Sequence, residues 1–403
     1  MGRAEVSVVL DRLARRFENA EQPVEGCPGL VGWGQFLDDP VTHRQTGPFG
    51  TSAGLIVSAL AGRGTAALAS RLVALPTLWW NQWQAQESDG YRLFCQTLRL
   101  AFFYLALKIS GILDENGIRS QVQEELLRRS LPSGLWGNYW ASDAVRDQTP
   151  RLFCSSVVVL CLSILEEVPQ PLAARLEPAL RGIEDRLLGD ADLPLLHVAA
   201  ASAAVLAARG TKISSKVRKR IRKSAWSLRA QVGDLSVYFY DFQYADSYGH
   251  VHVGRDYFIV PPEILMGIAG FEPGAPAALR QRAEAAAKAL LANIRTNQGV
   301  YRPDQEQRVS SKNQAWAALL LSLSLAPAPG SKIGKLLYGL RKERTGNWFT
   351  EAVFPLLSLL AITSEIVFFR DLGPLVNVAT GLGGLFVSAL YGPTFLRKWF
   401  PGR

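Results

Sequence analysis

Arginine residues recur in the polar loops that precede apolar, helix-forming segments of this chain. They are Arg44, Arg146 or Arg151, Arg255 and Arg308. If these loops meet at one end of the fold, several guanidinium groups lie beside several helix N-termini, and such a combination binds anions, phosphates above all. The pattern therefore predicts a site for a phosphate-bearing small molecule, such as a nucleotide, a prenyl diphosphate or a lipid head group, or for a protein partner.

Acidic side chains in the same loops support a second interpretation, in which the arginines form local ion pairs. They are Asp38, Asp39, Asp147, Asp256 and Glu306. The sequence alone leaves both interpretations open.

Histidine, glutamine and tyrosine side chains extend the candidate site. The run 237–258 (VYFYDFQYADSYGHVHVGRDYF) supplies aromatic rings and imidazoles that can stack on a ligand or move protons. The alternative for this run is a packed loop that closes the fold. The predicted ligand-binding set is His43, Arg44, Gln45, Arg151, Tyr248, His250, Arg255 and Arg308.

No complete catalytic or metal-binding motif accompanies these residues. The sequence has no GxSxG, P-loop or Rossmann fingerprint, and its four cysteines and four histidines follow no zinc spacing. We expect neither a metal nor a cofactor, and the sequence leaves open whether the chain is an enzyme. Cys154 and Cys161 lie in apolar helical segments, so they are expected to be small buried side chains in a reducing compartment.

The chain carries a formal charge of +9 and has 48% hydrophobic residues, so anionic partners are expected alongside a large core. The segment 212–226 (KISSKVRKRIRKSAW) places Val217, Ile221 and Ala225 on one helical stripe and surrounds it with basic residues. It is predicted either to lie on anionic lipid or to be a solvated helix. Nucleic acid is not an expected partner, because no recognition motif accompanies the charge.

The elements that position these residues are helices. The segments 98–113, 152–165, 196–208 and 315–326 are apolar nearly all round, whereas 277–294 has a polar face. Segments that are apolar on every side belong inside a protein, where amphipathic helices cover them. The sequence therefore predicts two layers of helices. Strand-like alternation is clear only at 235–245, which has no evident partner.

One pattern repeats along the chain: a glycine beside an aromatic residue, a polar loop with arginine, a pair of small hydroxyl residues and an apolar helix. The copies start at Gly32, Gly134 and Gln298, and a looser fourth copy starts at Tyr248. The hydroxyl pairs are Thr51 with Ser52, Ser155 with Ser156, and Ser310 with Ser311. We expect them to cap the N–H groups of buried helix starts.

This repeated unit resembles the α/α-toroid proteins of the terpenoid-cyclase and protein-prenyltransferase type over about residues 5–330. The resemblance implies an all-α fold, an α/α toroid of repeated helical hairpins whose inner helices line a cavity. It does not extend to the acid and metal motifs of those enzymes. The nearest match to DxDD is Leu37-Asp38-Asp39-Pro40, and DDxxD is absent.

Two apolar segments end the chain, 348–369 and 374–396, and the second has no charged residue. Both are long enough to span a bilayer, so they predict a transmembrane helix pair. The alternative is two more helices that close the toroid. The predicted domains are 1–330 (toroid), 331–347 (basic juxtamembrane linker) and 348–403 (transmembrane hairpin).

Individual residues of this tail fit such a hairpin. Tryptophans near the ends suit the interfaces, glycines allow close helix contact, and a carboxylate inside a span needs a partner helix, water or the interface. These residues are Trp348, Glu365, Gly381, Gly383, Gly384 and Trp399. Basic residues on both outer flanks place the toroid and the C-terminus in the cytoplasm.

The favoured hypothesis is a sensor and effector of the bacterial inner membrane. In this hypothesis, the toroid binds an anionic ligand or a protein partner and controls the transmembrane pair. The chain is expected to form a homo-oligomer, and anionic lipid of the inner leaflet is a further expected partner. In its layout it is similar to antiphage (antiviral defence) effectors that disrupt membranes. The alternative is a membrane-associated enzyme of the terpenoid-cyclase or prenyltransferase type that acts on an isoprenoid or lipid.

Overall fold

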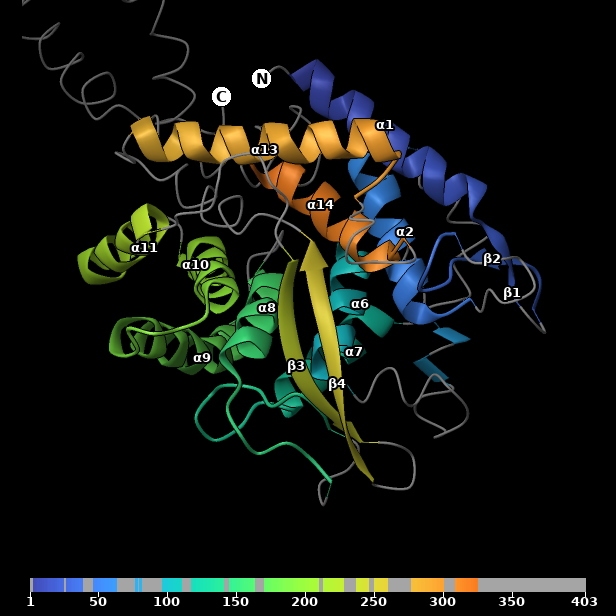
Figure 1. The fold of residues 1–403 in the computed structure, drawn as a ribbon. Coiled ribbons are helices and arrows are strands. Elements are labelled where there is room, and N and C mark those ends of the chain that lie inside the picture. The colour runs from blue at the N-terminus through green and yellow to red at the C-terminus, as the bar shows by residue number, and fades with distance from the viewer. Residues whose placement is uncertain are drawn as a thin grey trace, which may run out of the picture. The chain divides into compact units, whose positions relative to one another are not determined.

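The structure of the chain is a computed structural model (Figure 1), which describes residues 3–24, 27–38, 46–63, 77–78, 80–81, 96–110, 117–140, 145–163, 170–209, 213–227, 237–245, 250–259, 277–300 and 309–324. The chain divides into two compact units, Met1–Arg341 and Lys342–Arg403, and every described residue belongs to the first. The domain boundaries and the transmembrane pair therefore stay predictions. Within the described ranges, no helix combines the length and apolar character that a bilayer crossing requires.

The described part is mostly helical, which confirms the all-α prediction at that level. Its helices are α1 (Arg3–Asn19), α2 (Pro48–Leu60), α6 (Thr97–Ser110), α7 (Ile118–Arg128), α8 (Leu152–Ser163), α9 (Gln170–Gly189), α10 (Leu195–Arg209), α11 (Ser215–Ser227), α13 (Ala277–Asn297) and α14 (Ser311–Ser324). Two antiparallel hairpins accompany them, β1 (Gln22–Val24) with β2 (Cys27–Gly32) and β3 (Val237–Ala245) with β4 (Val251–Ile259).

An inner layer consists of α14, α2, α6, α8 and α10, each packed on the next in that order (Figure 1). Every residue of α8 is buried, as is nearly every residue of α2 up to Ser58. Their sequences contain almost no polar face, so burial on all sides is the arrangement that removes the most apolar surface from water. The predicted buried segments are thus confirmed where they are described.

An outer layer covers these helices. α1 packs on α2 and α14, α7 on α6, α9 on α8 and α10, α11 on α9 and α10, and α13 on α14. α1 shows why: Val9, Leu13 and Phe17 recur at four-residue spacing and are fully buried, whereas Val8 is 55% exposed. Inner helices follow outer helices directly at α1 and α2, at α7 and α8, and at α9 and α10, and the packing confirms the predicted two layers.

A repeated contact joins each loop to the inner helix that follows it. The backbone N–H of Trp33 donates to Thr51 Oγ1 at 3.1 Å, and that of Trp136 donates to Ser155 Oγ at 2.8 Å. Each acceptor is the fourth residue of its inner helix. These N–H groups are buried and need a partner, so the hydroxyls hold the loop against the helix.

The two tryptophans also tie the loop to the preceding outer helix. The indole N–H of Trp33 donates to the Phe17 carbonyl, and that of Trp136 to the Leu126 carbonyl. Both carbonyls lie two residues before the end of an outer helix. The Phe17 carbonyl also accepts the Ala20 N–H at 2.9 Å, and a carbonyl oxygen can accept a second donor such as the indole. One tryptophan therefore fixes the path from the outer to the inner helix in each repeat.

The expectation that hydroxyl pairs cap the inner helices is wrong for α2, whose N-cap is Gly47 without a side-chain hydrogen bond. Ser52 donates instead to the Pro48 carbonyl within α2. In the third repeat the position of Thr51 and Ser155 is taken by Gln314, the fourth residue of α14, which accepts the Val300 N–H at 2.7 Å. An amide there makes the same bond as a hydroxyl.

The first and third repeats meet at a seam. The Leu37 N–H donates to the Val309 carbonyl and the Ser311 N–H to the Gln35 carbonyl, both at 2.9 Å. Asp38 Oδ1 accepts the Val309 N–H at 2.8 Å. Asp38 is thus part of this seam, and α14 comes to lie beside α2.

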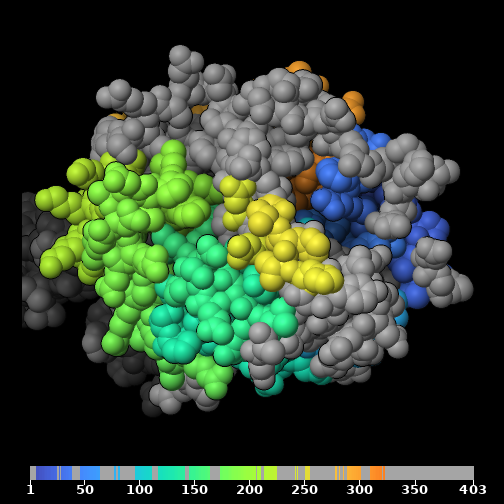
Figure 2. Space-filling view, turned by 60° about the horizontal axis from the view of Figure 1, so that its bottom comes forward, coloured from blue at the N-terminus to red at the C-terminus, as the bar shows by residue number. Residues whose placement is uncertain are grey.

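The segment 237–259 departs from the prediction. β3 does not stand alone, because β4 pairs with it from Val237 opposite Ile259 to Ala245 opposite Val251. The supposed fourth repeat from Tyr248 is therefore wrong over β4. Aromatic and β-branched residues, which both strands contain, favour a strand, and an antiparallel partner satisfies its backbone groups. Figure 2 shows hairpin atoms, in yellow, at the surface between the green and blue parts of the molecule.

Candidate ligand site at the starts of the inner helices

Aromatic rings from three inner helices meet near their N-terminal ends. Phe102 of α6 and Trp316 of α14 have ring centroids 5.8 Å apart, and Phe49 of α2 lies 5.1 Å from Phe102. α6 and α14 flank α2, and α1 covers its outer side. Rings from the two flanking helices can therefore meet only on the inward side of α2.

A cation stands at the edge of this cluster. The guanidinium carbon of Arg99 lies 5.3 Å from the centroid of the Phe49 ring. Arg99 is the third residue of α6 and lies one turn before Phe102, so it is nearer the start of α6 than the Phe102 ring is. Phe102 and Trp316 are 2% and 7% exposed, whereas Phe49 and Arg99 are half-buried. The part of the cluster around Phe102 and Trp316 is therefore tightly packed, and the part around Phe49 and Arg99 is more open to solvent.

A second ring pair joins two other inner helices. Phe153 of α8 and His197 of α10 stack with centroids 5.7 Å apart. Burial lowers the pKa of His197, because a charged imidazole would lose hydration there. The neutral ring therefore dominates at pH 7 and can act as a hydrogen-bond acceptor or a base.

Arg151, a predicted ligand residue, is paired with an acid of its own loop. Its Nε donates to Asp147 Oδ2 at 3.0 Å, and its Nη2 lies 3.5 Å from Gln243 Oε1 on β3. This is the local ion pair that the second interpretation predicted. Arg151 retains 35% side-chain exposure. It links the start of α8 to the hairpin.

Asp147 organises this loop. Burial, the largest single influence, raises the pKa of Asp147, but hydrogen bonds from Asn138 N, Arg151 and Thr149 N, with the charge of Arg151, outweigh it and lower the pKa below its ordinary value. The carboxylate is therefore charged at pH 7. It accepts N–H groups from both sides of the loop, from Asn138 at 2.9 Å and Thr149 at 3.0 Å.

Arg146, the other arginine of this loop, lies against an aromatic ring. Its guanidinium carbon is 4.6 Å from the centroid of Trp140, and that of Arg128 is 4.9 Å from the same ring. Arg128 also pairs with Glu125. These cations stabilise the loop through cation–π contacts.

The other predicted site residues are only partly placed. His250 is exposed immediately before β4, and Arg255 stands opposite Asp241 in the backbone register of the hairpin. His43, Arg44, Gln45, Tyr248, Arg308, Trp348, Glu365, Gly381, Gly383, Gly384 and Trp399 lie outside the described residues. Whether the predicted arginines share one site stays untested. Within the described ranges, no cluster of three His, Cys, Asp or Glu side chains suits a metal.

Sequence reasoning missed Arg99, Phe49, Phe102, Trp316 and His197. A signal existed for Arg99, which with Lys108 is one of two charged residues in the segment 98–113.

The cysteines of α8 are buried and unreactive. Burial raises the pKa of Cys161 to about 12, and the pKa of Cys154 rises for the same main reason. The thiols stay protonated, and the prediction that they are small buried side chains is confirmed.

A groove of about 370 Å³ lies on the outer layer. It is lined by Ser133, Leu135, Pro150, Gly182, Asp185, Arg186, Gly189 and Asp190. Its volume suits a small molecule, but five of its eight lining residues come from α9 and the residue after it. It shares no residue with the aromatic cluster, where rings and a cation from different inner helices converge, and we place the candidate site at the cluster.

The chain matches no protein-family model and no curated protein. A solved structure of the type II terpene cyclase MstE from Scytonema, in complex with geranylgeranyl dihydroxybenzoate, is similar with a TM-score of 0.49 and 12% sequence identity. The similarity covers 83% of this chain and 98% of the cyclase chain. At this level it carries over neither substrate nor mechanism.

Proposed function

We propose that the helical body is an α/α toroid that binds an elongated apolar molecule with a phosphate-bearing head, of the isoprenoid or phospholipid class. The observation that carries the proposal is Arg99 above Phe49, at the open edge of a ring cluster from three inner helices. Aromatic faces offer apolar contact area, and a guanidinium binds a phosphate through charge-assisted hydrogen bonds.

Helix polarity favours the same end of the body. Arg99, Phe49 and Trp316 all lie within the first six residues of their helices. The N-terminus of a helix carries partial positive charge and attracts anions. A head group at this end would meet the helix starts and Arg99, while the apolar part would lie against the rings.

The test compares farnesyl diphosphate with farnesol, using the full chain and its tryptophan fluorescence. The diphosphate is expected to bind the wild type, and Arg99→Gln to weaken its binding about tenfold or more, with a small effect on farnesol. Phe49→Ala is expected to weaken both. Arg175→Gln, an exposed arginine of α9, is the matched control. Unchanged diphosphate binding by Arg99→Gln, or none by the wild type, contradicts the proposal.

We further propose that ligand binding controls a membrane-inserted tail at the bacterial inner membrane, with the body cytoplasmic and the chain a homo-oligomer. The specific support is the stretch 374–396, which has 23 residues and no charge. In alkaline-carbonate extraction the full chain should stay in the membrane pellet and a chain that ends at residue 347 should not. Expression of the full chain alone should depolarise cells. Equal toxicity of both chains would show that the tail is not the effector.

A catalytic role for the helical body is the second candidate. His197 favours it, because burial lowers the pKa of this histidine and leaves a neutral imidazole on an inner helix. If the protein converts an isoprenoid diphosphate, His197→Phe should abolish product formation, followed by mass spectrometry, and leave farnesyl diphosphate binding within about twofold. A wild type that binds the diphosphate but releases no product over hours supports binding alone.

A further inference from the structure

The apolar stripe of α11 is buried against other helices of the protein. Val217 and Ile221 are 1% and 2% exposed, and the helix packs on α9 and α10. A membrane helix of the amphipathic kind needs its apolar stripe free for the acyl chains. α11 therefore cannot insert into a bilayer while the body is folded, and its surface can act only through charge.

Arg220 of α11 also forms hydrogen bonds within the protein. Arg220 donates from Nε to the Leu187 carbonyl at 3.0 Å and from Nη2 to the Asp190 carbonyl at 2.8 Å and the Ala191 carbonyl at 3.2 Å. These carbonyls lie at and just beyond the end of α9, where intrahelical donors run out. Arg220 is thereby fixed in place and caps α9.

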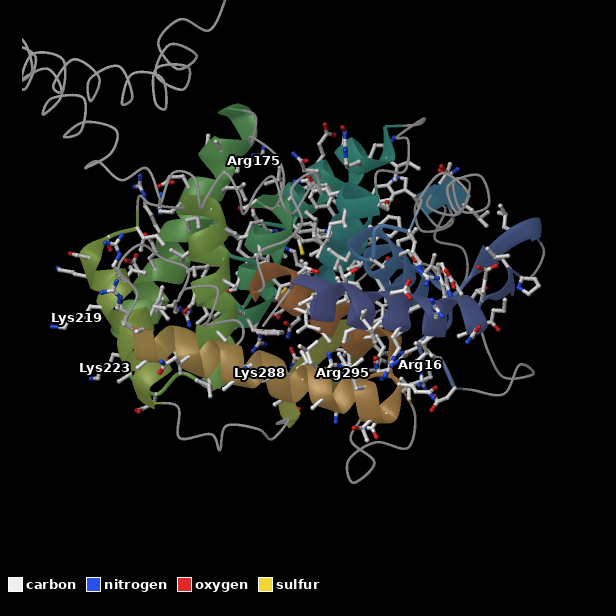
Figure 3. The ribbon with its side chains drawn as sticks, turned by 90° about the horizontal axis from the view of Figure 1, so that it is seen from above. Arg16, Arg175, Lys219, Lys223, Lys288 and Arg295 are labelled. Atoms are coloured by element: carbon white, nitrogen blue, oxygen red, sulfur yellow. The ribbon has the colours of Figure 1, made fainter. Side chains whose placement is uncertain are left out.

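Three exposed lysines lie on the outer side of α11. Lys216, Lys219 and Lys223 are exposed, and their spacing of three and four residues puts them in one row along the helix. No acidic residue occurs between positions 213 and 227, and no ion pair joins these lysines to an acid within the described part of the chain. Figure 3 shows Lys219 and Lys223 at the end of the body that carries α11, and Lys288 further along on α13.

We propose that this row, the lysine face of α11, docks the body onto an anionic bilayer by charge alone. The inference rests on the proposed place of the body at a membrane and adds the surface and the lipid class. Lysine ammonium groups are mobile point charges, which suit a fluid layer of phosphates, whereas planar arginines suit fixed bidentate partners. On α11 the lysines point outward and Arg220 inward, which favours a bilayer over nucleic acid.

The test uses the full chain with vesicles of phosphatidylcholine, alone or with 30% phosphatidylglycerol. Acetylation at each lysine is followed by mass spectrometry. On the anionic vesicles, acetylation of Lys216, Lys219 and Lys223 is expected to slow about fivefold, the factor that matches the attraction of one lysine to an anionic leaflet. At 0.5 M NaCl the protection is expected to disappear, because salt screens exposed charges within a few ångströms.

Paired variants make the test specific. Lys219→Gln with Lys223→Gln should remove the protection of Lys216, whereas Arg181→Gln with Arg186→Gln, which removes the same charge from exposed positions of α9, should not. Equal acetylation on both vesicle types overturns the proposal. Protection by duplex DNA or RNA, but not by vesicles, overturns it in favour of nucleic acid. Farnesyl diphosphate binding should be unchanged in the lysine variant, so this test and that of the ligand site fail independently.

Discussion

Ser155 of α8 accepts the backbone N–H of Trp136 at 2.8 Å and donates to the Arg151 carbonyl at 2.7 Å, so one hydroxyl joins a loop to the helix that follows it. Ser155 is fully buried. Without the hydroxyl, the Trp136 N–H would be left in the protein interior without its acceptor, which is costlier than losing an exposed hydrogen bond.

Ser155→Ala is therefore expected to lower the free energy of unfolding by about 1–3 kcal/mol. Ser156→Ala is the matched control, because Ser156 donates only to the Leu152 carbonyl within α8 and should cost less than about 1 kcal/mol. Urea unfolding followed by tryptophan fluorescence measures both. Equal losses would show that the loop contact contributes little.

Gly54 lets the Trp33 ring lie on α2. A Cβ at this position would be 2.4 Å from Cε3 of Trp33. Gly54→Ala should therefore destabilise the protein by about 1–3 kcal/mol, although alanine favours helix elsewhere. Gly189→Ala, where a Cβ meets nothing within 4 Å, should be close to neutral. Thermal unfolding of the two variants gives the comparison, and a stable Gly54→Ala would mean that Trp33 can move aside.

Acid sensitivity should depend on Asp147. The pKa of Asp147 is lowered in the folded protein, so its contribution to stability is present above the unfolded pKa of about 4 and is lost as pH falls through the lower folded pKa. Asp147→Asn should reduce stability at pH 7 and flatten its decline below about pH 4. Asp192→Asn, at an exposed position, is the charge-matched control. Parallel acid-unfolding curves for wild type and Asp147→Asn would contradict this role.

The helical layers were predictable because burial leaves a clear record in composition. α8 contains no charged residue, and α1 alternates Val9, Leu13 and Phe17 with charged positions. β4 was missed because His252, Gly254, Arg255 and Asp256 interrupt its apolar alternation, and only its partner β3 makes it a strand. A strand pairing is a long-range property that one segment does not reveal.

The residues of the candidate site were harder to predict from the sequence than the fold was. A hydroxyl near a helix start can cap that helix or bind the preceding loop, and the sequence does not distinguish the two for Thr51. Gln314 binds the preceding loop through its amide oxygen, so a search for pairs of hydroxyl residues does not identify it. Arg99 and Phe49 come from different helices, and their contact depends on how α2 and α6 pack.

The seam between Leu37 and Val309 also sets the order in which the chain can mature during synthesis. Residues 35–38 leave the ribosome about 270 residues ahead of their partners at 309–311. At 5–20 residues per second this delay is roughly 14–54 s. Throughout that time α2 lacks α14, its apolar neighbour in the folded protein, so an apolar surface of the nascent chain stays uncovered. Of the inner helices that the structure describes, the last in the chain thereby completes the packing of the first.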